Sequence, residues 1–183
     1  MTKVTFKAFT IRDIVFLAVI TAVTLLFSGP FAPLVMTATK LGVQAIAMAL
    51  PFSLMTSVGL RKVKKPGSLT LIGLFSGLVL LLMAPVMFFN QLIGALLSEG
   101  TALLLFKTYD NKKTILFSSG LFSFFTIPLT AIVNILAKGR SIEEQIGNPL
   151  TFVLIVAGTI ILGFAGAFIG NKIADELEKA GKL

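Results

Sequence analysis

The sequence predicts an all-α integral membrane protein with six transmembrane helices and both termini in the cytoplasm. Of its 183 residues, 56% are hydrophobic and 13% are charged, and the mean hydropathy is +0.97. A soluble domain has about 45–50% apolar and about 25% charged residues, so a water-soluble fold is excluded. The charges also fall in short clusters between long neutral stretches, which is typical of membrane spans and their loops.

Each predicted span is a neutral stretch measured against the roughly 20 apolar residues that cross a hydrocarbon core. Residues 66–106 carry Glu99 as their only charge and are about twice as long as one span, so this stretch must turn once. Pro85 lacks a backbone N–H and Asn90 is polar, which places the turn at residues 84–90. The predicted spans are residues 12–29, 41–60, 69–84, 91–106, 114–137 and 149–170, in a single membrane domain (1–183) with a solvated cytoplasmic tail at 171–183.

The orientation is predicted from the distribution of basic residues. Six spans place both termini on one side, and 13 of the 16 Lys and Arg residues fall on that side. Cytoplasmic loops carry an excess of Lys and Arg, so we expect both termini to lie in the cytoplasm. The expected location of the protein is the plasma membrane. The 13 residues are Lys3, Lys7, Arg12, Arg61, Lys62, Lys64, Lys65, Lys107, Lys112, Lys113, Lys172, Lys179 and Lys182, which leaves Lys40, Lys138 and Arg140 on the other side.

The first predicted span carries two local signals. Thr10 is expected to cap the helix, with Asp13 in its first turn. Ala18 and Ala22 form a small-x-x-x-small pattern, which places two small side chains on one face and lets another helix approach closely. Packing within the chain is the alternative for this pattern, because the same spacing recurs in Gly73 with Gly77 and in Gly166 with Gly170.

The outer connections are where a solute from outside would arrive. Residues 28–40 form an apolar segment broken by prolines, which either caps a pocket or rests on lipid. Residues 84–91 combine Met and Phe side chains with amides, which suits a neutral, partly aromatic solute, although bundle packing is the alternative for any single Phe. The candidate binding residues are Phe31, Met36, Gln44, Met87, Phe88, Asn90, Gln91, Asn134 and Asn148.

Glu99 is the only carboxylate predicted deep within a span. Ionisable groups at such depth are costly, so they usually face the interior and have a partner or a task. The carboxyl is expected to be protonated, bound to hydroxyls such as those of Ser98 or Thr101, or displaced toward the cytoplasmic end. A structural role and a ligand contact both remain open for it.

The composition also excludes several classes of function. The chain has no His and no Cys, which removes the usual zinc, haem, thiol and Ser-His-Asp chemistries, so we expect no catalytic, metal or cofactor site. It has no phosphate loop for ATP and no basic face with interleaved aromatics for nucleic acid. Apart from Arg12, the first residue of the first predicted span, no Arg lies within a predicted span, which favours a neutral, weakly polar solute over an anionic one.

The six spans, the cytoplasmic ends, the long first outer loop and Ala18 with Ala22 together resemble the substrate-binding S components of energy-coupling factor (ECF) vitamin transporters. The run K-V-K-K-P-G-S-L at residues 62–69 is also similar to the inner loop of a poorly defined branch of that family. The resemblance implies that Ala18 and Ala22 dock onto a transmembrane coupling subunit and that two ATPase subunits complete the complex. It further implies a vitamin or related micronutrient as substrate, such as pyridoxine, a hydroxymethylpyrimidine or cobalamin. The alternatives are a stand-alone solute carrier and, less favoured, an intramembrane enzyme.

Overall fold

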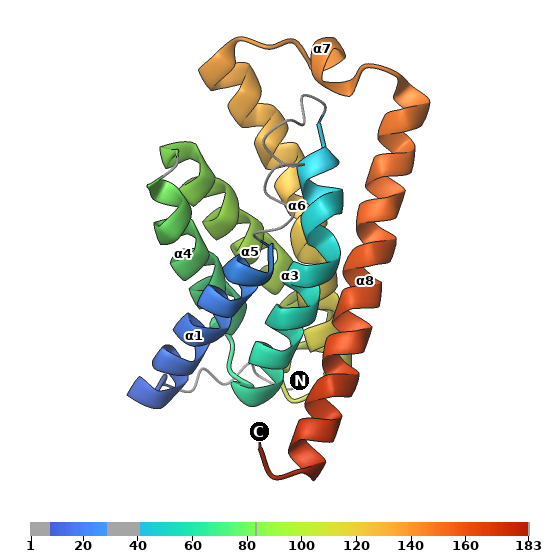
Figure 1. Cartoon of the computed structure of the whole chain (residues 1–183). Coiled ribbons are helices and arrows are strands. Elements are labelled where there is room, and N and C mark those ends of the chain that lie inside the picture. The colour runs from blue at the N-terminus through green and yellow to red at the C-terminus, as the bar shows by residue number, and fades with distance from the viewer. Residues whose placement is uncertain (1–7, 29–40, 83, 183) are drawn as a thin grey trace.

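The computed structural model describes residues 8–28, 41–82 and 84–182, and every regular element in these ranges is a helix (Figure 1). The prediction of an all-helical membrane protein is confirmed at this level. The helices are α1 (Ile11–Ser28), α3 (Val43–Lys62), α4 (Ser68–Leu81), α5 (Pro85–Phe106), α6 (Lys112–Lys138), α7 (Ile142–Ile146) and α8 (Pro149–Lys179).

Within the described ranges, four helices are long and apolar enough to cross a membrane, namely α1, α5, α6 and α8. Helix α4 is a shorter apolar helix of 14 residues. Helix α3 lies in the middle of the bundle and packs most extensively against α8, and it also contacts α6 and α1 (Figure 1). The four to five candidate spans fit a multi-pass protein.

The long helices run alternately up and down, so that α1, α4 and α6 begin where α3, α5 and α8 end (Figure 1). Two ion pairs show this directly: Lys65 binds Asp13 at 2.6 Å, and Lys112 binds Asp175 at 2.7 Å. We call this end of the bundle, which carries Arg61, Lys65 and Lys112, the basic end. The opposite end is called the amide end, after the Asn and Gln side chains described below.

The predicted start of the first helix is confirmed. The Asp13 backbone N–H donates to Thr10 Oγ1 at 3.3 Å, and the Thr10 backbone N–H and hydroxyl both donate to Asp13 Oδ2 at 2.8 Å. This reciprocal pattern satisfies N–H groups that have no partner within the helix. The Lys65 ammonium binds the same carboxylate, so the cap also ties α1 to the connection between α3 and α4.

The predicted turn at residues 84–90 is wrong, because α5 begins at Pro85 and continues through Asn90. Ala84 is the extended N-cap residue, and the proline occupies the start of the helix. A proline is well suited to the first helical position, since its fixed φ is already helical and its missing N–H is not needed there. The polar residues read as a turn are therefore helical, and their side chains lie on the bundle.

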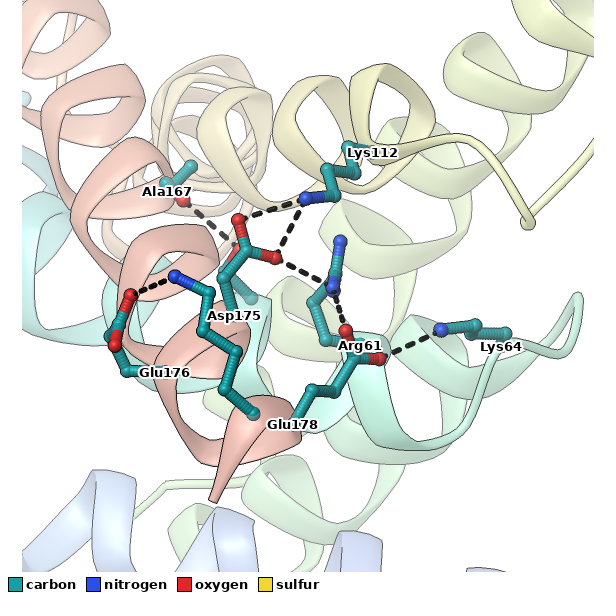
Figure 2. Close-up of polar contacts among 9 residues, drawn as sticks. Arg61, Lys64, Lys112, Ala167, Asp175, Glu176 and Glu178 are labelled. Carbon is teal, nitrogen blue, oxygen red and sulfur yellow. Dashed lines mark hydrogen bonds and ion pairs between the residues drawn. The ribbon is translucent and has the colours of Figure 1, made fainter. Parts of the chain in front are cut away.

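Most described residues of the predicted solvated tail are exposed, but one face of it packs against the bundle. Helix α8 continues to Lys179, and Asn171 and Ala174 within this extension are buried. Asp175 and Glu178 bind Arg61 of α3, at 2.7 Å and 2.5 Å, and the Arg61 side chain is 3% exposed (Figure 2). The remaining ion pairs of this network join Lys64 to Glu178 at 2.9 Å and Lys112 to Asp175 at 2.7 Å.

Small residues allow the helices to approach closely near the middle of the bundle. A Cβ atom added to Gly163, Gly166 or Gly170 of α8 would collide with the backbone carbonyl of Gly120, Leu50 or Leu54, respectively. Where lipid provides no hydrophobic contrast, such close packing is a main source of helix association. The space beside Gly73 and Gly77 of α4 is likewise occupied by atoms of α5. Both glycine pairs with the small-x-x-x-small spacing therefore pack within the chain.

Candidate functional site

Two helices bring a group of amide and hydroxyl side chains together at the amide end. Asn90 of α5 donates its Nδ2–H to Thr130 Oγ1 of α6 at 2.9 Å, and the Thr130 hydroxyl donates to the Thr126 carbonyl at 2.7 Å. The Asn90 Oδ1 and Gln91 Oε1 atoms are buried and accept no hydrogen bond from any described residue. A buried acceptor without a donor is costly, so these two oxygens are suited to a ligand that brings hydroxyl or N–H groups.

A second amide pair lies next to this group. Asn134 follows Thr130 by one helical turn and donates to Gln145 Oε1 of α7 at 3.1 Å. Gln145 is 1% exposed, and its Nε2 donates to the Arg140 and Ser141 carbonyls at 3.4 Å. The Gln145 backbone carbonyl accepts the Leu41 N–H at 3.0 Å, which ties the short helix α7 to the start of α3.

Thr130 and Gln145 were not among the candidate binding residues predicted from the sequence. A signal for Thr130 was present, because Ser123, Thr126, Thr130 and Asn134 are spaced by three or four residues and so share one face of α6. No comparable signal marks Gln145, since its burial depends on how α7 folds back against the bundle.

The other predicted binding residues have different surroundings. Met87 and Phe88 are half-buried, and the Phe88 ring packs against Gly77 of α4. Asn148 is exposed, and its Oδ1 accepts the Leu150 N–H at 2.9 Å as the N-cap of α8. Phe31, Met36 and the side chain of Gln44 lie outside the described residues.

The amide cluster, which we define as Asn90, Gln91, Thr130, Asn134 and Gln145, contains neutral side chains only. Two of its amide oxygens, those of Asn90 and Gln91, are buried and have no described hydrogen-bond partner. In surroundings of low dielectric, such polar atoms orient a ligand while the apolar groups supply contact area. The side chains of this cluster are therefore chemically suited to a neutral, weakly polar molecule.

The family model described as a hypothetical bacterial integral membrane protein, Trep_Strep, matches residues 10–176. The chain belongs to this family. Comparison with curated proteins and with solved structures gave no match. The family description adds that the protein is a bacterial integral membrane protein, in agreement with its candidate spans.

In this Trep_Strep protein, Glu99 accepts hydrogen bonds from residues at the start of α4. Its carboxylate accepts the Gly67 N–H at 2.7 Å, the Thr70 N–H at 2.9 Å and the Thr70 hydroxyl at 2.5 Å. An anionic group at a helix N-terminus is stabilised by the free N–H groups and the helix dipole. Glu99 is thus displaced toward the basic end and has a structural partner there.

The expected hydroxyl partners of Glu99 were wrong. The Ser98 hydroxyl donates instead to the Ser118 carbonyl of α6 at 2.5 Å, and the Thr101 hydroxyl donates to the Ser98 carbonyl at 2.9 Å. Tyr109 lies close to the Glu99 carboxylate, and burial together with this negative charge raises the pKa of Tyr109 well above its ordinary value.

Helix α1 of the Trep_Strep protein carries the small-residue pair Ala18 with Ala22 beside the face that it buries in the bundle. Its buried face consists of Leu17, Thr21, Thr24 and Ser28. Ala18 is half-buried at the edge of that face, and Ala22 is exposed.

Proposed function

We propose that this protein is the substrate-binding subunit of an ECF-type ABC importer. It captures a neutral vitamin or related micronutrient at the amide end and delivers it together with a transmembrane coupling subunit and two ATPase subunits. The subunit itself has no catalytic activity in this proposal. The observation that carries the proposal is the surface position of Ala18 and Ala22.

Three of the small-residue pairs in the sequence differ in what covers them. The pairs Gly73 with Gly77 and Gly166 with Gly170 are filled by α5 and α3, respectively, so their close packing is already used. No described helix fills the surface at Ala22, which is exposed beside bilayer-facing residues such as Val19, itself 54% exposed. A small-residue pair on such a face favours the approach of a helix from another chain.

The proposed orientation places the basic end in the cytoplasm and the amide end outside. It follows from the 13 basic residues on one side, because cytoplasmic loops are enriched in Lys and Arg. In this topology α3 and α4 complete a set of six spans, and both termini are cytoplasmic. An external solute then meets the amide cluster first, on the side opposite to the ATPases.

The proposed substrate class follows from the neutral amide cluster. The unpartnered oxygens of Asn90 and Gln91 favour a solute that donates hydrogen bonds. The cluster contains no cationic side chain that could pair with a carboxylate or phosphate. Pyridoxine, a hydroxymethylpyrimidine and cobalamin are the candidates that we would test first.

Co-purification tests the proposal directly. The tagged protein is co-expressed with the coupling subunit and the two ATPases of its own organism, and the Ala18→Trp, Ala22→Trp variant is compared with Ala157→Trp. Ala157 is also exposed, but on α8, so it controls for added bulk at a bilayer-facing surface.

We expect the wild-type and Ala157→Trp proteins to recover all three partners. The double variant should recover roughly tenfold less, because its indole rings keep the helices apart. Full assembly of the double variant would contradict the docking face. Solute uptake by the wild-type protein in vesicles without any partner would instead show a stand-alone carrier.

A further inference from the structure

A groove with a cavity volume of about 230 Å³ lies at the basic end, between the first turns of α6 and the last part of α8. It is separate from the amide cluster, which belongs to the opposite end of α6. Its lining combines two phenylalanines with three lysines. The residues that matter here are Lys112, Lys113 and Phe117 of α6 and Phe168, Asn171 and Lys172 of α8.

Asn171 is the most informative of these residues. Its side chain lines the groove, is 7% exposed, and has no hydrogen-bond partner for either Nδ2 or Oδ1 among the described residues. Leaving a buried amide without partners costs free energy, and buried polar groups in proteins are nearly always bonded. A ligand with both acceptor and donor atoms would satisfy both ends of this amide.

The charge of the groove favours an anion. Three lysines and Asp175 line it, which gives a net charge of +3 − 1 = +2. Lys112 is bound to both oxygens of Asp175, at 2.7 and 2.8 Å. Lys113 and Lys172 form no ion pair within the described ranges, and the Lys172 ammonium lies over the Phe168 ring, 5.2 Å from its centroid, so neither charge is neutralised by a carboxylate there.

The apolar residues that line the groove indicate which kind of anion it binds. The Phe117 ring lies in the groove and packs edge-on against Phe164 at 5.3 Å. Phe168 is 52% exposed and leads onto an apolar, outward-facing surface of α8 that includes Ile161, which is 67% exposed. A free phosphate gains nothing from such a surface, whereas the acyl chains of a lipid do.

We propose that this groove binds an anionic glycerophospholipid, with its phosphate between Lys113 and Lys172 and its chains along α8. A phosphate oxygen accepts from Asn171 Nδ2, and a headgroup hydroxyl donates to Asn171 Oδ1. Basic pockets between helices on the cytoplasmic side of a membrane are suited to such headgroups. The assignment to the inner leaflet rests on the orientation proposed above, but not on the transport function.

The test uses the purified full chain in detergent after removal of endogenous lipid. Native mass spectrometry measures binding of dioleoylphosphatidylglycerol and of dioleoylphosphatidylcholine, which share the same chains and differ in headgroup charge. Thermal unfolding with each lipid, and with inorganic phosphate alone, is measured in parallel. The variant Lys113→Gln, Lys172→Gln is compared with Lys62→Gln, Lys182→Gln, which removes the same charge at exposed positions outside the groove.

We expect phosphatidylglycerol to bind in preference to phosphatidylcholine. The groove variant should bind phosphatidylglycerol roughly tenfold to thirtyfold more weakly than the control variant. Inorganic phosphate alone should leave the unfolding temperature unchanged. Equal phosphatidylglycerol binding by the two variants would overturn the proposal, as would stabilisation by phosphate equal to that by the lipid, which would indicate a site for a free anion.

The variant Asn171→Leu provides a second, independent test if the lysine variant fails to fold. Because the amide has no hydrogen-bond partner among the described residues, its loss should not lower the unfolding temperature of the lipid-free protein. The increase in unfolding temperature caused by phosphatidylglycerol should shrink. An unchanged increase would contradict a contact between the headgroup and Asn171. These measurements involve neither partner assembly nor uptake, so their failure would leave the importer proposal standing.

Discussion

The two ends of the bundle are built differently. At the basic end, ion pairs join α3, α6 and α8, and the largest buried cluster of apolar side chains includes Leu60, Leu69 and Tyr109. At the amide end, the buried apolar cluster is small, consisting of Leu41, Ala45 and Ile127 with three half-buried neighbours. Buried polar atoms without a described partner occur at both ends: the Asn90 and Gln91 oxygens at the amide end, and atoms of Arg61, Tyr109, Thr114 and Asn171 at the basic end.

Helix α5 shows the same difference along its own length. Its residues toward the basic end, including Ser98 and Glu99, are buried and bound to neighbouring helices. Toward the amide end, Met87, Asn90 and Gln91 are only half-buried. The comparison indicates that ion pairs and a large apolar cluster make the basic end a rigid frame, whereas the amide end is held by fewer buried contacts. Local stability is expected to follow the density of buried contacts.

The largest expected effect is on the ion-pair network of the frame. Arg61→Met should lower the free energy of unfolding by roughly 2–4 kcal/mol, because it removes a buried cation that holds two carboxylates. The loss is smaller than for a fully buried pair, since Asp175 and Glu178 are partly exposed and keep lysine partners. The measurement is denaturation by sodium dodecyl sulfate in mixed micelles.

Arg140→Met provides the matched control at the amide end. Arg140 is exposed, so its loss should change the free energy of unfolding by less than about 0.5 kcal/mol. If both variants lost the same stability, the contrast between a rigid end and an adaptable end would be wrong.

A smaller effect is expected from two glycines of the same helix. In Gly166→Ala the new Cβ meets the backbone carbonyl of Leu50, which cannot move without shifting α3, so we expect a loss of roughly 1–3 kcal/mol. In Gly158→Ala, nearer the amide end, the new Cβ meets the Ile46 Cδ1 atom at 2.6 Å. The flexible Ile46 side chain can rotate away from it.

The second glycine variant should therefore cost less than about 1 kcal/mol, partly because alanine favours the helix. Thermal unfolding in detergent compares the two variants under identical conditions. A larger loss for Gly158→Ala than for Gly166→Ala would show that close packing is not concentrated in the frame.

The smallest effect concerns pH. Tyr109 is the only Tyr in a chain without Trp, so the absorbance of tyrosinate reports on this residue alone. Burial and the Glu99 carboxylate raise the pKa of Tyr109, so the folded protein should form no tyrosinate near pH 10, where an exposed tyrosine is half ionised.

The sign of the pH dependence follows from the same shift. Above about pH 10 the unfolded chain releases the phenol proton and the folded protein keeps it, so stability should fall as the pH rises. Below that pH, Tyr109 should contribute no slope. Tyr109→Phe should abolish the contribution, and half-ionisation of folded Tyr109 at its ordinary pKa would contradict its burial.

The sequence was sufficient for features that depend on nearby residues. Neutral stretches located most helix ends to within a few residues, except the start of α5 and the end of α8, and Thr10 with Asp13 marked the start of α1. The start of α5 was misplaced because Asn90 and Gln91 were read as membrane-surface groups. Their side chains are tolerated inside the bundle because Thr130 and the neighbouring helices surround them.

Features that depend on distant residues were beyond the sequence. The partners of Glu99 lie about 30 residues earlier, at the start of α4, and those of Arg61 lie more than 110 residues later, in α8. Single charges or hydroxyls give no pattern from which such pairs are predicted. The amide cluster was found in part, because Asn90, Gln91 and Asn134 are unusual in apolar helices, whereas Gln145 depends on the fold of α7.

The central claim is that the amide cluster holds a neutral solute, and the most direct measurement is the affinity of the small molecule that the protein retains. The molecule is identified by mass spectrometry after gentle purification, and its affinity is measured for Asn90→Ala, Gln91→Ala and for Asn111→Ala. Asn111 caps α6 at the basic end, so its variant controls for the loss of an amide. We expect the double variant to bind roughly tenfold more weakly, since each hydrogen bond contributes about 0.5–1.5 kcal/mol, and the control to bind like the wild type. Unchanged affinity in the double variant would contradict a solute site at the amide end.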